Sequence, residues 1–234
     1  MTIIKTVVCS FLFCLLFSHA CAQGLNAPPT LLLGYSTTNI VFKEVHQPDF
    51  NFFGIIIPSK PSFGGDGPEI GISKTFNEHI YFELSASLFK GAGINAEASS
   101  FGFGQYQNWA SHYKLKGIEI PVTANYLFRK KGRKLRPMLG AGFMYLNAHL
   151  RQVEISTDPN GVQTITQQND IKISELHFVI TGGIQFRIIP RLYICYGFNA
   201  STSLKGRYSD HVGMSVKYDL MNKKNKVITT PAVQ

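Results

Sequence analysis

Histidine, serine and carboxylate side chains near the end of the chain could support nucleophilic chemistry. His211, Ser215 and Glu175 supply a base, a nucleophile and an orienting acid. His177 supplies a second base. No nucleophile elbow surrounds Ser215, and a chain with 7 histidines offers many such sets by chance. We therefore predict that these histidines fill structural positions and that the chain is not an enzyme and has no catalytic residues.

Charged residues also recur at alternate positions of otherwise apolar segments. If those segments are strands of a narrow closed sheet, the charges point into its interior, where an isolated ion costs several kcal/mol. They must then pair with one another, so we predict a structural ion-pair network in the lumen. Its predicted members are Glu69, Glu83, Glu119, Glu175, Arg187, Lys217 and Asp219.

The elements that would position these residues are long strands. Between residues 176 and 188 apolar residues occupy the even positions and mostly polar residues the odd ones. The alternation recurs at 192–201 and 211–220. Such segments exceed the strands of a soluble sandwich and reach the ~9–11 residues that a membrane-spanning strand needs. The apolar face is therefore predicted to meet lipid, which agrees with a charged content of only 16%.

The whole chain divides into eight such strands, and the connections alternate in length. Short turns are expected at 77–79, 129–136 and 189–191, and both chain ends fall on their side; the connections on the other side are 43–66, 95–111, 152–170 and a brief one at 205–209. Short periplasmic turns and longer outer loops are typical of bacterial barrels. The fold class predicted is all-β, an eight-stranded antiparallel up-and-down transmembrane β-barrel. The other expected strands are 30–42, 67–76, 80–94, 113–128 and 137–151.

Two segments leave alternatives open. In the strand at 137–151 both faces are apolar; we expect the odd positions, such as Phe143, to face outward. Phe50–Ile57 is an apolar run inside a long connection. It is a protruding hairpin, a contact surface, or a sign that the first strand is misplaced.

Residues 1–22 have the features of a secretory signal peptide: Lys5, an apolar core at 7–17 and the cleavage site Ala20-Cys21-Ala22. A rival interpretation, ranked lower, makes Cys21 a lipidated N-terminus. Only Cys195 remains after cleavage, so no internal disulfide forms, and we expect it to fill space in the lumen. The predicted domains are the signal peptide at 1–22, the barrel at 23–220 and a short basic periplasmic tail at 221–234.

Much of the net charge of +9 lies on one side of the predicted barrel. An exported chain makes nucleic acid a poor partner, so these cations either face phospholipid phosphates or form solvated turns. No metal-ligand spacing appears, and Gly102-Phe103-Gly104 precedes no helix, so neither a metal nor a cofactor is predicted. The cations are Arg129, Lys130, Lys131, Arg133, Lys134, Arg136, Lys223, Lys224 and Lys226.

Two stretches resemble the outer-membrane β-barrel domain family of Bacteroidetes, the PorT-like barrels, which are related in shape to OmpX and the OmpA barrel. Residues 117–126, with Glu119, Ile120 and Pro121, look like its "LEIP" strand, although Ile118 replaces the usual leucine. Residues 136–142, ending in Gly140-Ala141-Gly142, look like the following "KPYLGAG" strand. The resemblance implies an eight-stranded barrel over the whole mature chain and implies no activity.

The last strand resembles the assembly signal of outer-membrane proteins. His211, Gly213, Val216 and Tyr218 match its polar, glycine, hydrophobic and aromatic positions, although a tail follows. This implies recognition by the barrel-insertion machinery.

These patterns predict a non-enzymatic, integral barrel of the cell outer membrane. Its role would be structural, or one of interaction or adhesion through long extracellular loops. The alternatives are a small channel or a secretion or assembly accessory barrel, and then a lipid-modifying outer-membrane enzyme. The expected partners are outer-membrane lipid, the insertion machinery and an extracellular or periplasmic protein, with the chain itself a monomer.

Overall fold

The computed structural model describes residues 29–45, 50–52, 55–57, 62–97, 108–129, 133–157 and 162–220. Within this part of the chain, eight strands close into one antiparallel barrel, which confirms the predicted fold class. No helix in it is long and apolar enough to cross a membrane. The barrel strands are β1 (Thr30–Val41), β4 (Ser62–Thr75), β5 (Ile80–Glu97), β6 (Asn108–Leu127), β7 (Leu135–Thr157), β8 (Gln163–Ile189), β9 (Leu192–Ser203) and β10 (Tyr208–Asp219).

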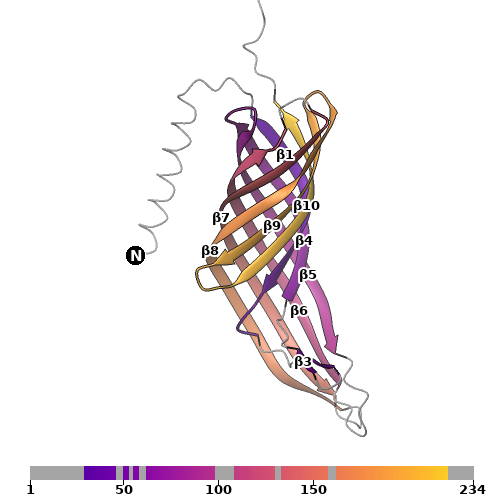
Figure 1. Cartoon of the computed structure of the whole chain (residues 1–234). Helices are drawn as coiled ribbons and strands as arrows, with labels where there is room; N and C mark the ends of the chain where they lie inside the picture. The colour runs from indigo at the N-terminus through magenta and orange to yellow at the C-terminus, as the bar shows by residue number, and fades with distance from the viewer. Residues whose placement is uncertain are drawn as a thin grey trace, which may run out of the picture.

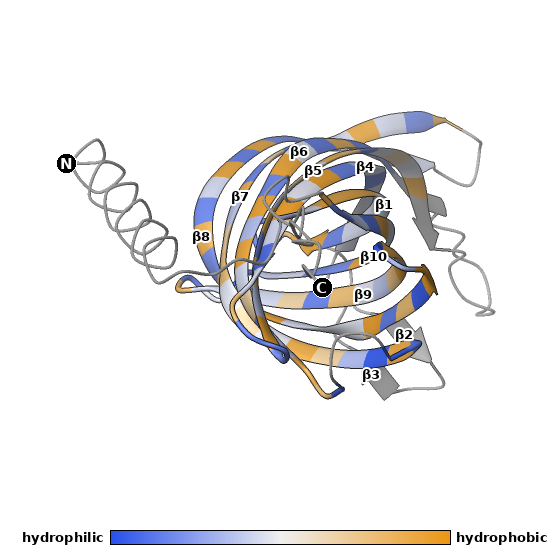
Figure 2. Cartoon of the chain, turned by 90° about the horizontal axis from the view of Figure 1, so that it is seen from above, coloured by the Kyte–Doolittle hydropathy of each residue, from blue (hydrophilic) through white to orange (hydrophobic). Residues whose placement is uncertain are grey.

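The barrel closes because its first strand pairs on both sides. β1 pairs with β10 from Thr30 opposite Asp219 to Ile40 opposite Ser209, and on its other side it pairs with β4. Leu220 N–H donates to the carbonyl of Pro29 at 2.9 Å, so the ladder ends where the first and last described residues meet. Seen along its axis, the sheet forms a ring around an interior (Figure 2). Within the ring itself no strand is left with an unpaired edge, as a bilayer requires.

Side chains alternate between the two faces of the wall as the sequence predicts. Along β7 the odd positions face outward: Phe143 is 58% exposed, whereas Met144 and Leu146 are buried. The expected facing of this strand is therefore confirmed. Both of its faces are apolar because one meets the surroundings of the barrel and the other meets an apolar part of the lumen.

The two ends of the barrel differ in construction. Turns at 76–79 and 190–191 and the short connection between β6 and β7, together with both ends of the described barrel, lie at what we call the short-turn end. At the opposite, long-loop end, β5, β6, β7 and β8 continue well past the shorter β1, β9 and β10 (Figure 1). Pairing persists along this extension as far as Thr157 opposite Gln163. The extension is thus a curved four-stranded sheet that projects from one side of the ring.

The apolar run in the first long connection forms a small hairpin outside the barrel. β2 (Phe50–Phe52) and β3 (Ile55–Ile57) pair antiparallel, with Phe50 opposite Ile57, in a sheet of their own. The protruding-hairpin alternative is therefore confirmed, and the first strand is not misplaced, since β1 begins at Thr30.

Candidate functional site: the lumen and the outer wall

A buried lysine and a glutamate form an ion pair across the lumen. Lys217 of β10 donates to Glu83 of β5, and its ammonium lies 4.9 Å from the ring centre of Tyr81. These strands are not neighbours in the ring, so the pair spans the interior. Both residues were predicted members of the network, and the structure brings them together.

A second polar cluster is centred on Glu119, which is 1% exposed. Its Oε2 lies 3.0 Å from His211 Nδ1 and accepts a hydrogen bond from the Thr38 hydroxyl at 3.0 Å. Glu69 Oε2 lies 3.9 Å from His211 Nε2. Four strands, β1, β4, β6 and β10, thus contribute to one cluster.

The third cluster lies at the long-loop end and is centred on Arg207. Its guanidinium donates to Glu175 Oε2 at 3.3 Å and to Glu44 Oε2 at 2.9 Å. It also lies 5.3 Å from the ring centre of Phe42. Hydrogen bonds from Arg207 hold the pKa of the Glu44 carboxyl below its ordinary value, against the raising effect of partial burial. His177 Nε2 lies 3.7 Å from Glu175 Oε2.

The remaining predicted members have different surroundings. Asp219 accepts a hydrogen bond from Thr30 at 2.6 Å. Arg187 is half-buried and makes no ion pair with any described residue. The set of His211, Ser215 and Glu175 is not assembled as a unit, because His211 pairs with Glu119 and Glu175 pairs with Arg207.

Sequence reasoning missed two buried arginines. Arg207 was assigned to a turn, but it lies just before β10 and points inward. Arg136 was assigned to the basic turn; it is buried because it occupies an even position of β7. Its guanidinium donates to the carbonyls of Arg129 and Glu78, at 3.0 Å and 3.1 Å, and so ties two short turns together. Carrying the inward parity of β7 to its first residues would have identified Arg136.

An apolar cluster fills the long-loop end of the lumen, a feature that the alternation of the strands does not predict. Its members come from β1, β4, β5, β6, β7 and β8 and from the segment after β1. The Phe63 ring packs edge-on against the rings of Phe42 and Tyr113, at 5.7 Å and 5.0 Å between ring centres. The buried members are Ile40, Phe42, Val45, Phe63, Phe89, Leu115, Met144, Leu146, Ala148, Leu150, Ile173 and Val179.

Little open space is left beside the polar clusters. A cavity of about 40 Å³ borders Glu69, Glu83 and Lys217. Since one water needs roughly 10–15 Å³ by this measure, the cavity holds only a few waters. Cys195 is a free, buried thiol on its wall, as expected for a residue that fills the lumen.

The residues of the family-like motifs lie on two paired strands. Glu119 and Pro121 point into the lumen from β6, and Ile120 points outward. Gly140 and Gly142 of β7 lie directly against β6: a Cβ built on Gly142 would lie 2.0 Å from the carbonyl oxygen of Val122. Close packing of these strands thus explains the glycines physically.

The outer wall is apolar around the ring. Tyr126 and Phe128 lie at the end of β6 on the short-turn side, and Tyr208 lies beside a turn at the other end. Aromatic residues at both borders of an apolar band are typical of outer-membrane barrels, so the architecture places the chain in the outer membrane. Val216 and Tyr218 of the assembly-signal match belong to this wall, and Gly213 lies on the inner face of β10. Exposed apolar residues include Leu33, Ile70, Phe82, Leu88, Leu139, Phe143, Leu176, Phe178, Ile180, Ile184, Ile194, Tyr196, Phe198, Val212, Met214 and Val216.

Among the described residues, no group of three His, Cys, Asp or Glu side chains is arranged to hold a metal ion. The predicted signal peptide at 1–22 and the predicted tail at 221–234 lie outside the described residues, as do Lys130 and Lys131.

No protein-family model and no curated protein matches the chain. Several solved structures are similar to it. One is Neisserial surface protein A, with 15% sequence identity and a TM-score of 0.49; the match covers 82% of this chain and 97% of that chain. Another is the attachment invasion locus protein Ail of Yersinia pestis, with 9% sequence identity and a TM-score of 0.46; the match covers 82% of this chain and 97% of that chain. A third is the outer membrane protein OprG from Pseudomonas aeruginosa, with 6% sequence identity and a TM-score of 0.46; the match covers 83% of this chain and 98% of that chain. At these scores the assignment of the barrel rests on the strand pairing of the chain itself.

Proposed function

We propose that the chain is a closed, non-conducting outer-membrane barrel whose activity is interaction, carried by the β5–β8 extension and the loops at the long-loop end. The observation that supports this most is the filled lumen. An apolar cluster occupies one end, and the Lys217–Glu83 and His211–Glu119 pairs cross the other part of the lumen. An eight-stranded ring has an interior just wide enough for side chains, so a filled lumen leaves no path for ions.

The shape of the molecule favours the long-loop end as the site of interaction. Long strands that stay hydrogen-bonded beyond the ring form a rigid support for contacts outside the membrane, whereas the short turns offer little surface. We assign the long-loop end to the cell exterior, because bacterial barrels place short turns and chain ends in the periplasm. The partner there is a protein or a component of the cell surface.

Single-channel conductance in a planar bilayer tests the closed lumen. The refolded chain is expected to give no conductance steps, and a heat-dependent gel shift checks that the barrel has formed. The double variant Phe42→Ala/Phe63→Ala removes rings from the apolar cluster and is the matched control: it is expected to give steps or flickering currents. Steady steps from the wild type would show an open lumen and support the channel alternative.

The finer assignments remain part of the proposal. We propose that residues 1–22 are cleaved, that the last strand is read by the insertion machinery through Gly213, Val216 and Tyr218, and that the chain belongs with the PorT-like barrels. N-terminal sequencing of the protein from outer membranes tests the first: it is expected to begin at Gln23. A lipid-linked Cys21 would support the rival interpretation.

A further inference from the structure

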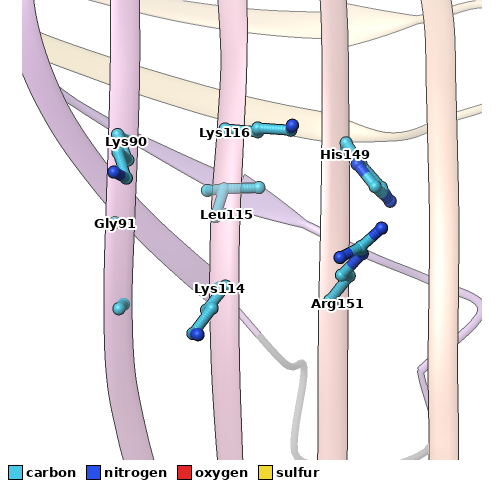
Figure 3. A pocket seen from close by; sticks show the side chains of 8 residues that line it. Lys90, Gly91, Lys114, Leu115, Lys116, His149 and Arg151 are labelled. Carbon is cyan, nitrogen blue, oxygen red and sulfur yellow. The ribbon is translucent and has the colours of Figure 1, made fainter.

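Cations gather in a hollow on the outside of the extension, next to the apolar wall. The hollow has a volume of about 270 Å³ and lies over β5, β6 and β7 (Figure 3). Its charged lining consists of Lys90, Lys114, Lys116, His149 and Arg151. All five side chains occupy outward positions of their strands, so none belongs to the lumen.

The strand register sets like charges directly opposite one another. Lys90 lies opposite Lys116, and Lys114 lies opposite Arg151. Directly opposed like charges destabilise a sheet. A sheet that keeps them gains stability when an anion lies between them.

The nearby carboxylates satisfy only part of this charge. Asp170 accepts a hydrogen bond from His149 and lies 3.6 Å from Arg151 Nε. The three lysines form no ion pair with any described residue. Asp66, opposite Lys90 in the register, accepts a hydrogen bond from the Tyr35 hydroxyl and makes no ion pair with Lys90.

The basic hollow continues into an apolar one. An adjoining hollow of about 580 Å³ shares Lys90, Lys116 and His149 and extends over Pro68, Leu88 and Ile118, with the Asp66 carboxylate also on its wall. Leu88 is 56% exposed and belongs to the apolar outer wall. One groove therefore runs from the lipid-facing wall to three lysines that form no ion pair with any described residue.

We propose that this groove binds a phosphorylated glycolipid of the outer leaflet, with an acyl chain along Leu88 and Ile118 and a phosphate among Lys90, Lys114 and Lys116. The groove is basic at one end and mostly apolar at the other. This favours a lipid over a soluble anion, because a soluble anion would make no contact with the apolar part. The proposal rests on the assignment of the long-loop end to the exterior.

Binding of diphosphoryl lipid A to the purified chain, followed by native mass spectrometry from detergent micelles, tests the site. The variant Lys90→Gln/Lys114→Gln/Lys116→Gln is expected to bind roughly a hundredfold more weakly, since each cation near an anionic lipid surface contributes about a fivefold factor. The matched control, Arg129→Gln/Arg133→Gln/Lys134→Gln, removes the same charge from exposed positions at the short-turn end and is expected to bind as the wild type does. The heat-dependent gel shift checks that both variants fold.

Two further probes identify the source of the anion. Dephosphorylated lipid A is expected to bind the wild type as weakly as diphosphoryl lipid A binds the triple variant. Inorganic pyrophosphate is expected to compete only weakly. Equal binding of the dephosphorylated lipid, full competition by pyrophosphate, or unchanged binding by the triple variant would each overturn the proposal.

A stability measurement keeps the test decisive if the triple variant fails to fold. Without anionic lipid, Lys116→Gln is expected to raise the urea midpoint of unfolding by relieving repulsion; with diphosphoryl lipid A, the wild type is expected to become the more stable. If the Lys116→Gln variant is less stable than the wild type both without and with diphosphoryl lipid A, the proposed site is contradicted. Conductance is independent of this readout, so failure of the closed-lumen proposal and failure of the lipid site are distinguishable.

Discussion

At the scale of single residues, inward-facing glycines differ in the space that they leave. A Cβ on Gly142 would lie 2.0 Å from the carbonyl oxygen of Val122, whereas the nearest atoms to a Cβ on Gly197 are 3.5 Å away. The first is a backbone clash and the second is ordinary contact. The same substitution should therefore have opposite consequences at two glycines of one lumen.

We expect Gly142→Ala to lower the free energy of unfolding by about 1–3 kcal/mol, the usual cost of overpacking, because β6 and β7 must separate. Gly197→Ala is the control and is expected to be nearly neutral. Urea unfolding followed by the fluorescence of the single tryptophan, Trp109, measures both. Equal effects would mean that contact with β6 does not explain the glycine.

The pairing of Lys217 with Glu83 makes a second prediction at this scale. Lys217→Met leaves the Glu83 carboxylate without its partner and is expected to cost about 3–5 kcal/mol of unfolding free energy. The double variant Glu83→Gln/Lys217→Met removes both charges and is expected to recover most of this loss. A double-mutant cycle in urea measures the coupling; additive losses would show that the two residues act independently.

At the scale of elements, Arg207 connects the segment after β1 to the turn before β10. It does so through Glu44 on one side and Glu175 on the other. The pKa of Glu44 is lowered by the hydrogen bonds from Arg207. A carboxylate with a lowered pKa contributes stability that is complete above its ordinary pKa and is lost as the pH falls through the lowered value.

We therefore expect the contact to persist at neutral pH and to break only below the ordinary pKa of a glutamate. The NMR signals of the Arg207 guanidinium should change in that acid range. Glu44→Gln should remove this step while leaving any change due to Glu175. A step at or above the pKa of a free glutamate would contradict the contact.

At the scale of the whole molecule, the asymmetry of the barrel decides what each side of the membrane meets. The extension and the groove lie at the long-loop end, and the buried Arg136 ties two turns together at the short-turn end. Reversing the orientation would expose short turns to the exterior and put the extension in the periplasm. Orientation therefore determines whether the extension can meet anything outside the cell.

Cysteine labelling on intact cells tests the orientation. Val162→Cys lies at an exposed position of the long-loop end and is expected to react with a membrane-impermeant maleimide. Arg133→Cys, in a short turn, is expected to react only after the membrane is permeabilised. Cys195 is buried, so the background from the wild type should be low. The opposite labelling pattern would invert the assignment.

The sequence is enough to predict eight barrel strands and the facing of their side chains, but it does not predict where the strands end: residues 152–157 and 163–170, expected in a long loop, belong to β7 and β8. Period-two alternation reports the two faces of each strand directly, and the alternation of loop lengths reports the up-and-down order. The same parity correctly placed the lumen side chains of Glu83, Glu119 and Lys217. These properties are local along the chain, and so they can be read without knowledge of which strands meet.

Which of these residues meet depends on how the ring closes in three dimensions. Ring closure sets Lys217 against Glu83 and His211 against Glu119, from strands that are not adjacent, and the register sets Lys90 against Lys116. The apolar cluster combines residues of several strands that alternation alone assigns only to "inside". The lumen and the groove depend on distances across and around the ring, and strand periodicity carries no information about those distances.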